Sequence, residues 1–180
     1  ADAKGRIYVS AVQQLDPWRD DQSYPEGDVW IVSSTDAGAT FGKPMMVNDR
    51  AGASDDPKAT RSAKEGMHAM AVDPGGTVHL TWLDHRRAPR TGQMIAYAHV
   101  TDAGTKVSKN LLAYIPEKTE CECCTPSIAV DLQGHPRIAF RNAVGPSKDI
   151  WSTASVDGGK TFKTVDRIAG VGAAVGRALR

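Results

Sequence analysis

The sequence predicts an all-β protein assembled from repeated four-stranded units, and three observations predict it. Short runs rich in Val, Ile, Tyr, Trp and Thr, such as Val78–Leu83, alternate with Gly, Pro, Asn and Asp, which is typical of strands separated by turns. Few stretches show helical periodicity. An eight-residue stretch, Ser34–Phe41 (STDAGATF), recurs with unchanged spacing at Ser155–Phe162 (SVDGGKTF).

A longer repeat underlies the duplicated stretch. Ala71–Val78 (AVDPGGTV) aligns with Ala129–Pro136 (AVDLQGHP), so that the two aspartates lie 58 positions apart. A third, degenerate copy of the duplicated stretch, His99–Gly104, keeps the Asp and the Gly but lacks the final Thr-Phe. Repeats with a period of this order are the mark of solenoids and propellers.

The repeat assigns strands in order along the chain. The first unit has three expected strands and the other two have four. They lie near 5–12, 28–34 and 40–48, then near 68–73, 77–83, 93–99 and 105–112, and finally near 126–131, 136–141, 149–155 and 161–168. Antiparallel four-stranded units that repeat around an axis are β-propeller blades.

The 180 residues therefore form one domain of about three blades. We place the blades at about 5–50, about 66–113 and about 124–168, followed by an Ala- and Gly-rich tail at 169–180. Because propellers typically close with about four to eight blades, we expect a partial ring, half of a six-bladed propeller, with a first strand missing before residue 1. The completing blades would come from another chain or from a segment outside this one.

The duplicated stretch falls in the turn between the third and fourth strands of a blade. Its Asp carboxylate can accept hydrogen bonds from backbone N–H groups of its own turn, and its Gly adopts a backbone shape that other residues resist. The Thr suits a strand start and the Phe can pack into the blade. We therefore interpret ten residues as structural and not as catalytic or Ca²⁺-binding: Ser34, Asp36, Gly38, Thr40, Phe41, Ser155, Asp157, Gly159, Thr161 and Phe162.

The two complete stretches resemble the Asp-box, or BNR repeat, of sialidase-like propellers, and the resemblance covers roughly residues 5–168. Asp-box proteins include sialidases, other glycosidases, sorting receptors and photosystem assembly factors. The resemblance therefore implies the fold more firmly than an activity.

The chain departs from sialidases where their chemistry is most diagnostic. Sialidases resemble each other in an Arg-Ile-Pro segment whose Arg clamps the substrate carboxylate, a task suited to guanidinium. The most similar segment here, Cys124–Ile128, has Cys at the position of that Arg, and its middle-blade equivalent, Gly66–Met70, has no Arg either. We expect a non-catalytic module that binds or assembles with a glycan or protein at the channel mouth. The alternative is an exo-sialidase whose catalytic arginines lie in other blades.

A few residues near strand ends are candidates for chemistry or binding. Asp84 follows a second strand, where the resemblance implies a catalytic acid, although polar strand ends repeat in each blade and favour a structural role. Trp18 lies in a long polar loop where an aromatic ring can meet a sugar. Arg86 and Arg141 are candidate binding residues beside such strand ends.

The three cysteines lie together directly before the inner strand of the last blade. In the 58-residue repeat, Cys124 aligns with Gly66, directly before His68 and Met70 in the inner strand of the middle blade. We therefore expect the two segments to be neighbours. Thiolates, a thioether and an imidazole suit Cu(I) or Zn²⁺, which makes a copper, zinc or redox site one reading. The alternative is a local disulfide in an oxidising compartment, for which the first and third cysteines have easier geometry than the adjacent pair. The residues concerned are Cys121, Cys123, Cys124, His68 and Met70.

Charge and hydropathy exclude two classes of partner. The net charge of +1, from 22 basic and 21 acidic residues, argues against nucleic acid as the main partner. No apolar run approaches the length of a membrane span. Ala1–Ala3 (ADA) is a plausible mature start after a cleaved secretory segment, so we expect an exported protein, periplasmic or extracellular.

Overall fold

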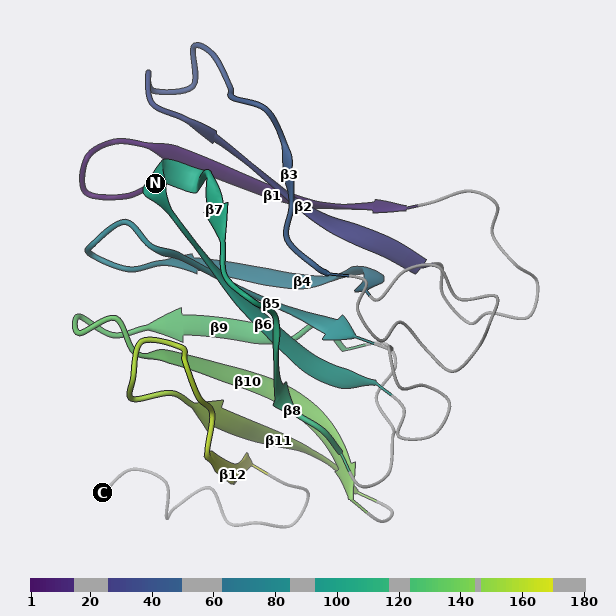
Figure 1. Ribbon diagram of the computed structural model, residues 1–180. Coiled ribbons are helices and arrows are strands. Elements are labelled where there is room, and N and C mark those ends of the chain that lie inside the picture. The colour runs from purple at the N-terminus through teal and green to yellow at the C-terminus, as the bar shows by residue number, and fades with distance from the viewer. Residues whose placement is uncertain (15–25, 50–62, 85–92, 117–123, 145–146, 170–180) are drawn as a thin grey trace.

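The computed structural model describes residues 1–14, 26–49, 63–84, 93–116, 124–144 and 147–169 (Figure 1). These residues form an all-β structure with one single-turn 3-10 helix, η1 (Asp102–Gly104). The strands are β1 (Ile7–Gln14), β2 (Glu26–Ser34), β3 (Met45–Met46), β4 (Ala63–Val72), β5 (Val78–Asp84), β6 (Met94–Thr101), β7 (Lys106–Val107), β8 (Leu111–Tyr114), β9 (Ser127–Val130), β10 (Pro136–Val144), β11 (Ser147–Ala154) and β12 (Thr164–Ala169). None of the described residues belong to a helix long and apolar enough to cross a membrane.

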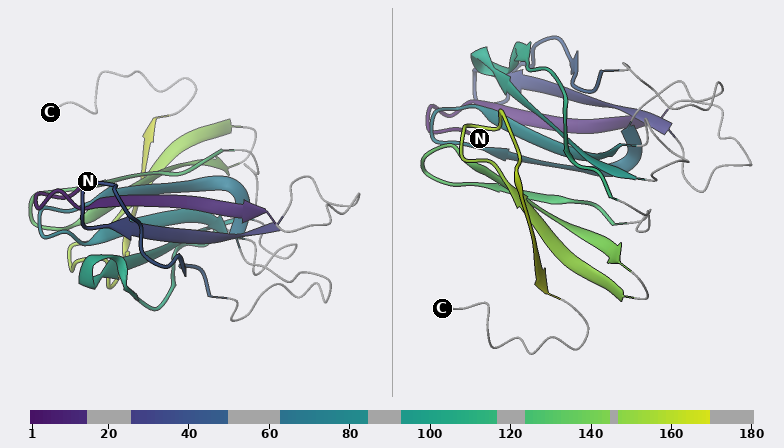
Figure 2. Two further views of the ribbon diagram at one scale, coloured as in Figure 1. Left: turned by 90° about the horizontal axis from the view of Figure 1, so that it is seen from above. Right: turned by 60° about the horizontal axis from the view of Figure 1, so that its bottom comes forward.

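The strands form three groups in chain order. The first group is β1–β3, the middle group is β4–β8 and the last group is β9–β12, and every pairing between described strands is antiparallel. One corner contact, Glu26 with Lys64 and Gly27 with Ala63, joins the first two groups into an eight-stranded sheet. The last group is a separate four-stranded sheet. Figure 2 shows the last group splayed away from the other two.

The middle group is buried on both faces. Successive side chains of a strand point to opposite faces, so Leu80 and Trp82 of β5 pack against the first group whereas Leu83 packs against the last. Two core clusters result, one on each side of the middle group. The first contains Tyr8, Val29, Ile31, Val47, Val78, Leu80, Trp82, Ala96, Ala98 and Val100, and the second contains Leu83, Ile95, Tyr97, Ala113, Ile138 and Phe140.

The two duplicated stretches fold into the same turn. In the first, Asp36 accepts hydrogen bonds from Ser34 Oγ at 2.7 Å, from Thr40 N at 2.9 Å and from Thr40 Oγ1 at 2.6 Å. In the second, Asp157 accepts the equivalent bonds from Ser155 and Thr161 at 2.6, 2.9 and 2.6 Å. Each carboxylate is therefore used within its own turn, between the third and fourth strands of its group.

A second recurring turn joins the first and second strands, and its copy at Asp2 escaped the sequence analysis. The Asp carboxylates accept the backbone N–H four residues later, from Arg6 at 3.0 Å, Thr77 at 2.8 Å and His135 at 2.8 Å. The Gly three residues after each Asp has positive φ, at 75°, 88° and 81° for Gly5, Gly76 and Gly134. The sequence signal was Asp-x-x-Gly at residues 2–5. It makes β1 the equivalent of β5 and β10, each the second strand of its group.

Several strand bounds differ from the expected ones. The stretch expected at 40–48 contains only the two-residue β3, and the strand expected at 105–112 is divided into β7 and β8. The division occurs because the chain leaves the ladder at Ser108, whose N–H donates to His99 O at 2.8 Å and whose Oγ accepts from His99 N at 3.0 Å. β4 begins five residues earlier than expected, because its start pairs with β2 and β5.

We expect Asp157→Asn to lower the stability of the protein at neutral pH and to make that stability less sensitive to acid. The hydroxyls of Ser155 and Thr161 and the N–H of Thr161 donate to the charged carboxylate, which holds the pKa of Asp157 well below its usual 3.8. The stabilisation is therefore complete above about pH 4 and is lost as the pH falls through the lower, folded-state pKa. Urea midpoints measured from about pH 7 to about pH 2 check this.

Asp166→Asn is the matched control, because Asp166 is an exposed carboxylate on β12 outside the turn. Its acid profile should follow that of the unmodified protein. Identical acid profiles for the two variants would contradict a stabilising role of the Asp157 carboxylate.

Candidate functional site

The antiparallel strands give the molecule two unlike ends. One end carries the short Asp turns. The other end, which we call the loop end, contains the C-terminal ends of β5, β8 and β10 and the starts of β6, β9 and β11 (Figure 1). Its described residues include Asp28, Asp84, Gln93, Tyr114, Cys124, Arg141, Asn142 and Asp149.

Three carboxylates at the loop end are buried and engaged. Asp28 accepts a hydrogen bond from Asn48 Nδ2 at 3.1 Å, and Asp84 accepts one from Trp82 Nε1 at 3.0 Å. Asp149, 3 % exposed, forms an ion pair of 2.6 Å with Arg167 across β11 and β12. The contacts of Asp28 and Asp149 join segments that are remote in sequence, whereas that of Asp84 lies within β5.

Asp84, the candidate acid, has an exposed fraction of 0 %. A general acid must come within hydrogen-bond reach of the atom that it protonates, and the carboxyl of Asp84 faces the indole of Trp82 inside the fold. The equivalent position in the last group is Asn142, which is also buried and donates to Tyr114 Oη at 2.7 Å. The geometry favours the structural reading of Asp84, and a catalytic role stays a prediction.

Arg141 has a different setting, because it is an exposed cation at the loop end. Its Nη1 donates to Cys124 Sγ at 3.6 Å, and its neighbour Phe140 packs on Tyr114 with ring centroids 4.8 Å apart. A hollow of about 20 Å³ lies between the middle and last groups and is lined by Leu83, Gln93, Ile95, Tyr114, Pro116, Phe140, Arg141 and Asn142. Ligand pockets measure several hundred Å³, so this hollow by itself is too small to hold a ligand.

Of the five candidate metal ligands, the structure describes His68, Met70 and Cys124. His68 and Met70 lie on the face of β4 turned to the first group, where His68 Nε2 and Ser10 Oγ are 3.1 Å apart. Met67, on the opposite face, accepts from Thr125 Oγ1 at 3.3 Å beside the start of the last group. Alternate residues of a strand face opposite ways, so His68 and Met70 face away from the side of β4 that meets the start of the last group. Cys121 and Cys123 lie outside the described residues, and the metal set stays a prediction. Among the described residues, no three His, Cys, Asp or Glu side chains are placed to hold a metal ion.

Four further candidates lie outside the described residues: Trp18, Arg86, Cys121 and Cys123.

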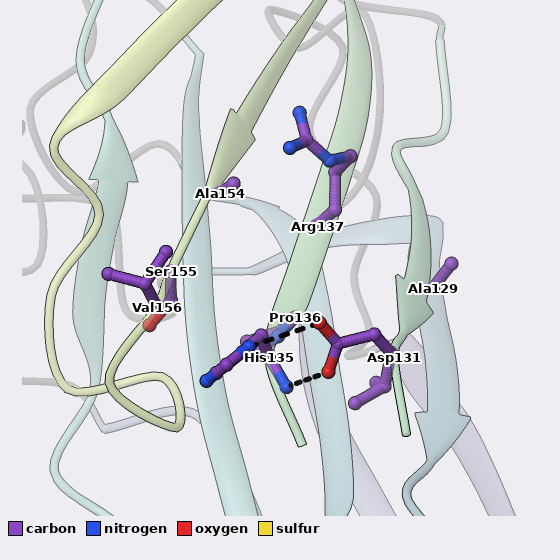
Figure 3. Close-up of a pocket in the computed structure, with 9 residues that line it drawn as sticks. Ala129, Asp131, His135, Pro136, Arg137, Ala154, Ser155 and Val156 are labelled. Carbon is purple, nitrogen blue, oxygen red and sulfur yellow. Dashed lines mark hydrogen bonds and ion pairs between the residues drawn. The ribbon is translucent and has the colours of Figure 1, made fainter. Parts of the chain in front are cut away.

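A larger hollow, which the sequence did not indicate, lies at the turn end of the last group. It has a volume of about 320 Å³ and contains Asp131, His135 and Arg137 (Figure 3). Asp131 accepts from both the backbone N and the Nδ1 of His135, at 2.8 and 3.0 Å, and Arg137 donates to Ser152 Oγ at 3.3 Å. Asp131 and His135 are thus hydrogen-bonded to each other, and Arg137 is hydrogen-bonded to a residue outside the lining.

Comparison with solved structures shows which known folds the chain resembles. A protein of unknown function from Dyadobacter fermentans matches with a TM-score of 0.59 and 17% identity, over 92% of this chain and 48% of that one. The intramolecular trans-sialidase from Ruminococcus gnavus, solved with oseltamivir carboxylate, matches with a TM-score of 0.52 and 16% identity, over 81% of this chain and 28% of that one. The leech intramolecular trans-sialidase, solved with 2,7-anhydro-Neu5Ac, matches with a TM-score of 0.52 and 14% identity, over 80% and 19%.

The chain has a sialidase-like fold. No family model matches it, so no model confirms the Asp-box resemblance, and no curated protein matches it. The sialidase-like chain spans less than half the length of each of the three solved structures.

Proposed function

We propose that this sialidase-like chain is a non-catalytic binding module, and that its loop end binds a glycan that carries a carboxylate. One observation carries the proposal: at the loop end the cation of Arg141 is exposed, whereas the carboxylates of Asp28, Asp84 and Asp149 are buried and engaged. An exposed guanidinium suits a carboxylate ligand, because the two groups can form a charge-assisted pair.

The same observation weighs against hydrolysis by the described residues. Most glycosidases use two carboxyl groups that flank the scissile bond and reach the sugar, so the observation bears on hydrolases of that kind and not on sialidases, which use a Tyr nucleophile. The buried carboxyls at the loop end have no such access. An exo-sialidase whose catalytic groups lie elsewhere in a longer protein is the alternative, and it rests on the likeness to trans-sialidases alone.

The three groups act as three blades of a larger ring. Phe162 of the last group packs edge-on against Tyr97 of the middle group, with centroids 4.9 Å apart. Phe41 has the same place in its turn, but it is 48 % exposed on the outer side of the first group. A further blade packed there would cover Phe41 as the middle group covers Phe162. Such a blade comes from another part of the same protein or from another chain.

Export and a disulfide between Cys121 and Cys124 belong to the same proposal. Disulfides persist in oxidising compartments such as the periplasm and the extracellular space. The copper or zinc alternative has less support, because His68 and Met70 face the first group.

We expect Arg141→Ala to weaken binding of 3′-sialyllactose by about tenfold or more, because a charge-assisted contact contributes about 1.5 kcal/mol or more. Titration followed by NMR shifts measures the affinity, with neutral lactose as the control ligand. Arg137→Ala is the matched control variant, because Arg137 is exposed on the same face of β10 but at the turn end.

Three outcomes would contradict the proposal: no binding to the unmodified protein, equal binding of lactose, or equal losses in both Arg variants. Turnover of a fluorogenic sialoside by the unmodified protein would favour the exo-sialidase alternative.

A further inference from the structure

We propose that the joint between the middle and last groups is a pH-sensitive catch, which holds at neutral pH and loosens in mild acid. Its centre, which we call the histidine cluster, consists of Asp73, His79, Tyr97 and His99 of the middle group. Two turns of the last group cover this cluster. The inference concerns the turn end of the molecule and does not rest on the glycan binding proposed for the loop end.

His79 is buried and is held through both nitrogens of its ring. Its Nδ1 lies 2.6 Å from Tyr97 Oη, and its Nε2 lies 3.4 Å from Asp73 Oδ2. An ionised carboxylate can only accept hydrogen bonds, so the neutral ring carries its hydrogen on Nε2. Nδ1 therefore accepts a hydrogen bond from the Tyr97 hydroxyl, and both ring nitrogens are satisfied in the uncharged form.

A second imidazole lies beside the first. His99 is opposite His79 in the ladder between β5 and β6, with ring centroids 6.3 Å apart. The Nδ1 of His99 is buried without a hydrogen-bond partner. A proton on either ring therefore repels a proton on the other, and Asp73 is the carboxylate that attracts both.

The last group covers the histidine cluster with two of its turns. Gly159 lies over the Tyr97 hydroxyl so closely that a Cβ would overlap it, and Phe162 packs edge-on against the Tyr97 ring. Gly134, in the turn before β10, lies against Asp73, where a Cβ would be 3.3 Å from Oδ2. The side chains that hold His79 are thus the same ones against which the last group packs.

The remaining charges that face the histidine cluster belong to the last group. Asp157 acts on Tyr97, and Lys160 acts on His99. Burial lowers the pKa of both His79 and His99 and outweighs the attraction of Asp73, and Lys160 lowers the pKa of His99 further. Both rings are therefore neutral in the closed joint at neutral pH.

A proton on His79 disturbs this arrangement. The charged ring carries a hydrogen on Nδ1 as well, so Nδ1 must donate to Tyr97 Oη and can no longer accept from it. The Tyr97 hydroxyl then needs a new acceptor beneath Gly159, and no described group other than His79 is hydrogen-bonded to it. Separation of the last group would let water accept that hydrogen and solvate the charged rings.

The direction of the pH effect follows from the lowered pKa values. The open joint binds protons more readily than the closed one, because burial lowers the histidine pKa values only in the closed form. The closed joint is fully favoured above pH 6.5, the usual pKa of histidine, and loses stability as the pH falls from there toward the lower pKa of the closed form.

A buried thiol probe measures opening of the joint. Thr153 is fully buried on the face of β11 turned to the middle group, since it lies opposite Ile138 and Val165 of the second core cluster. The labelling rate of Thr153→Cys is divided by the rate in the urea-unfolded protein at each pH. Peptide mapping by mass spectrometry separates the probe from the three native cysteines.

We expect this ratio to rise about tenfold or more between about pH 7.5 and about pH 5.5, because protons favour the open joint. Val29→Cys, in a separate protein, is the reference probe, because Val29 is fully buried in the first core cluster, away from the last group. Its ratio should rise much less. A flat profile at the Thr153→Cys probe would overturn the proposal, and so would equal rises at both probes, which indicate global unfolding.

His79→Gln in the Thr153→Cys protein tests which group takes up the proton. Glutamine can donate to Asp73 and accept from Tyr97 but does not bind a proton near neutral pH, so most of the rise should disappear. His135→Gln is the matched control and should keep the rise, because His135 is an exposed histidine that also bonds an aspartate, Asp131.

An undiminished rise in His79→Gln, or an equal loss of the rise in His135→Gln, would refute the catch. If His79→Gln is unfolded at neutral pH, as fast labelling of the Val29→Cys probe in the same variant would show, His99→Gln takes its place. A smaller rise in His99→Gln than in the unmodified background then supports the catch, and an unchanged rise refutes it.

Discussion

Gly159→Ala should destabilise the protein by about 3 kcal/mol or more, through overpacking and backbone strain together. Gly159 is buried where the turn of the last group meets the middle group, and its φ is +85°. A Cβ at this position would overlap the phenol oxygen of Tyr97 and lie 2.6 Å from its Cζ. Tyr97 has no room to withdraw, because it is fully buried and its Oη is 2.6 Å from His79 Nδ1.

Gly38→Ala is the matched control, because Gly38 has the same place in the first duplicated turn and a φ of +91°. A Cβ there would only touch Ile7 Cδ1 at 3.4 Å, so strain alone should cost about 1–2 kcal/mol. Urea unfolding of both variants measures the difference. Equal losses would mean that the contact between Gly159 and Tyr97 does not hold the two groups together.

Asp84→Ala is expected to cost about 2–3 kcal/mol of stability, because it leaves the buried Trp82 Nε1–H without this acceptor. Asp84→Asn retains an oxygen acceptor of the same shape and should cost about 1 kcal/mol or less. A purely catalytic acid would show the opposite pattern, with activity lost and stability kept.

A double-mutant cycle with Trp82→Phe isolates the contact between Trp82 and Asp84. We expect a coupling free energy of about 1–3 kcal/mol from urea unfolding of the two single variants and the double variant. Coupling near zero would refute the structural role that we assign to Asp84.

Turns were more predictable from the sequence than strands. The spacing Ser-x-Asp-x-Gly-x-Thr-Phe located both duplicated turns, because their hydrogen bonds join residues two to four positions apart. Local spacing also located β5 and β6 within about two residues. It failed for β3 and β7, which are only two residues long; β7 ends where the chain leaves the ladder at Ser108.

The candidate site was less predictable because its geometry depends on which face each residue occupies. The sequence placed His68 and Met70 near the cysteines, but the register of β4 turns both toward the first group. The sequence also gave no sign that Asp84 is enclosed by the packing of Trp82. The copy of the hairpin turn at Asp2 was visible as Asp-x-x-Gly and was missed because it stands alone before β1.

The separation of the two ends has an evolutionary and practical consequence. Corner turns anchored by Asp side chains hold the strands in register from one side, so we expect exposed positions at the other end, such as Arg141, to contribute little to folding. Substitution there should be tolerated much as in the hypervariable positions of other all-β scaffolds. A library that randomises only exposed positions of this kind would explore recognition while the framework stays constant.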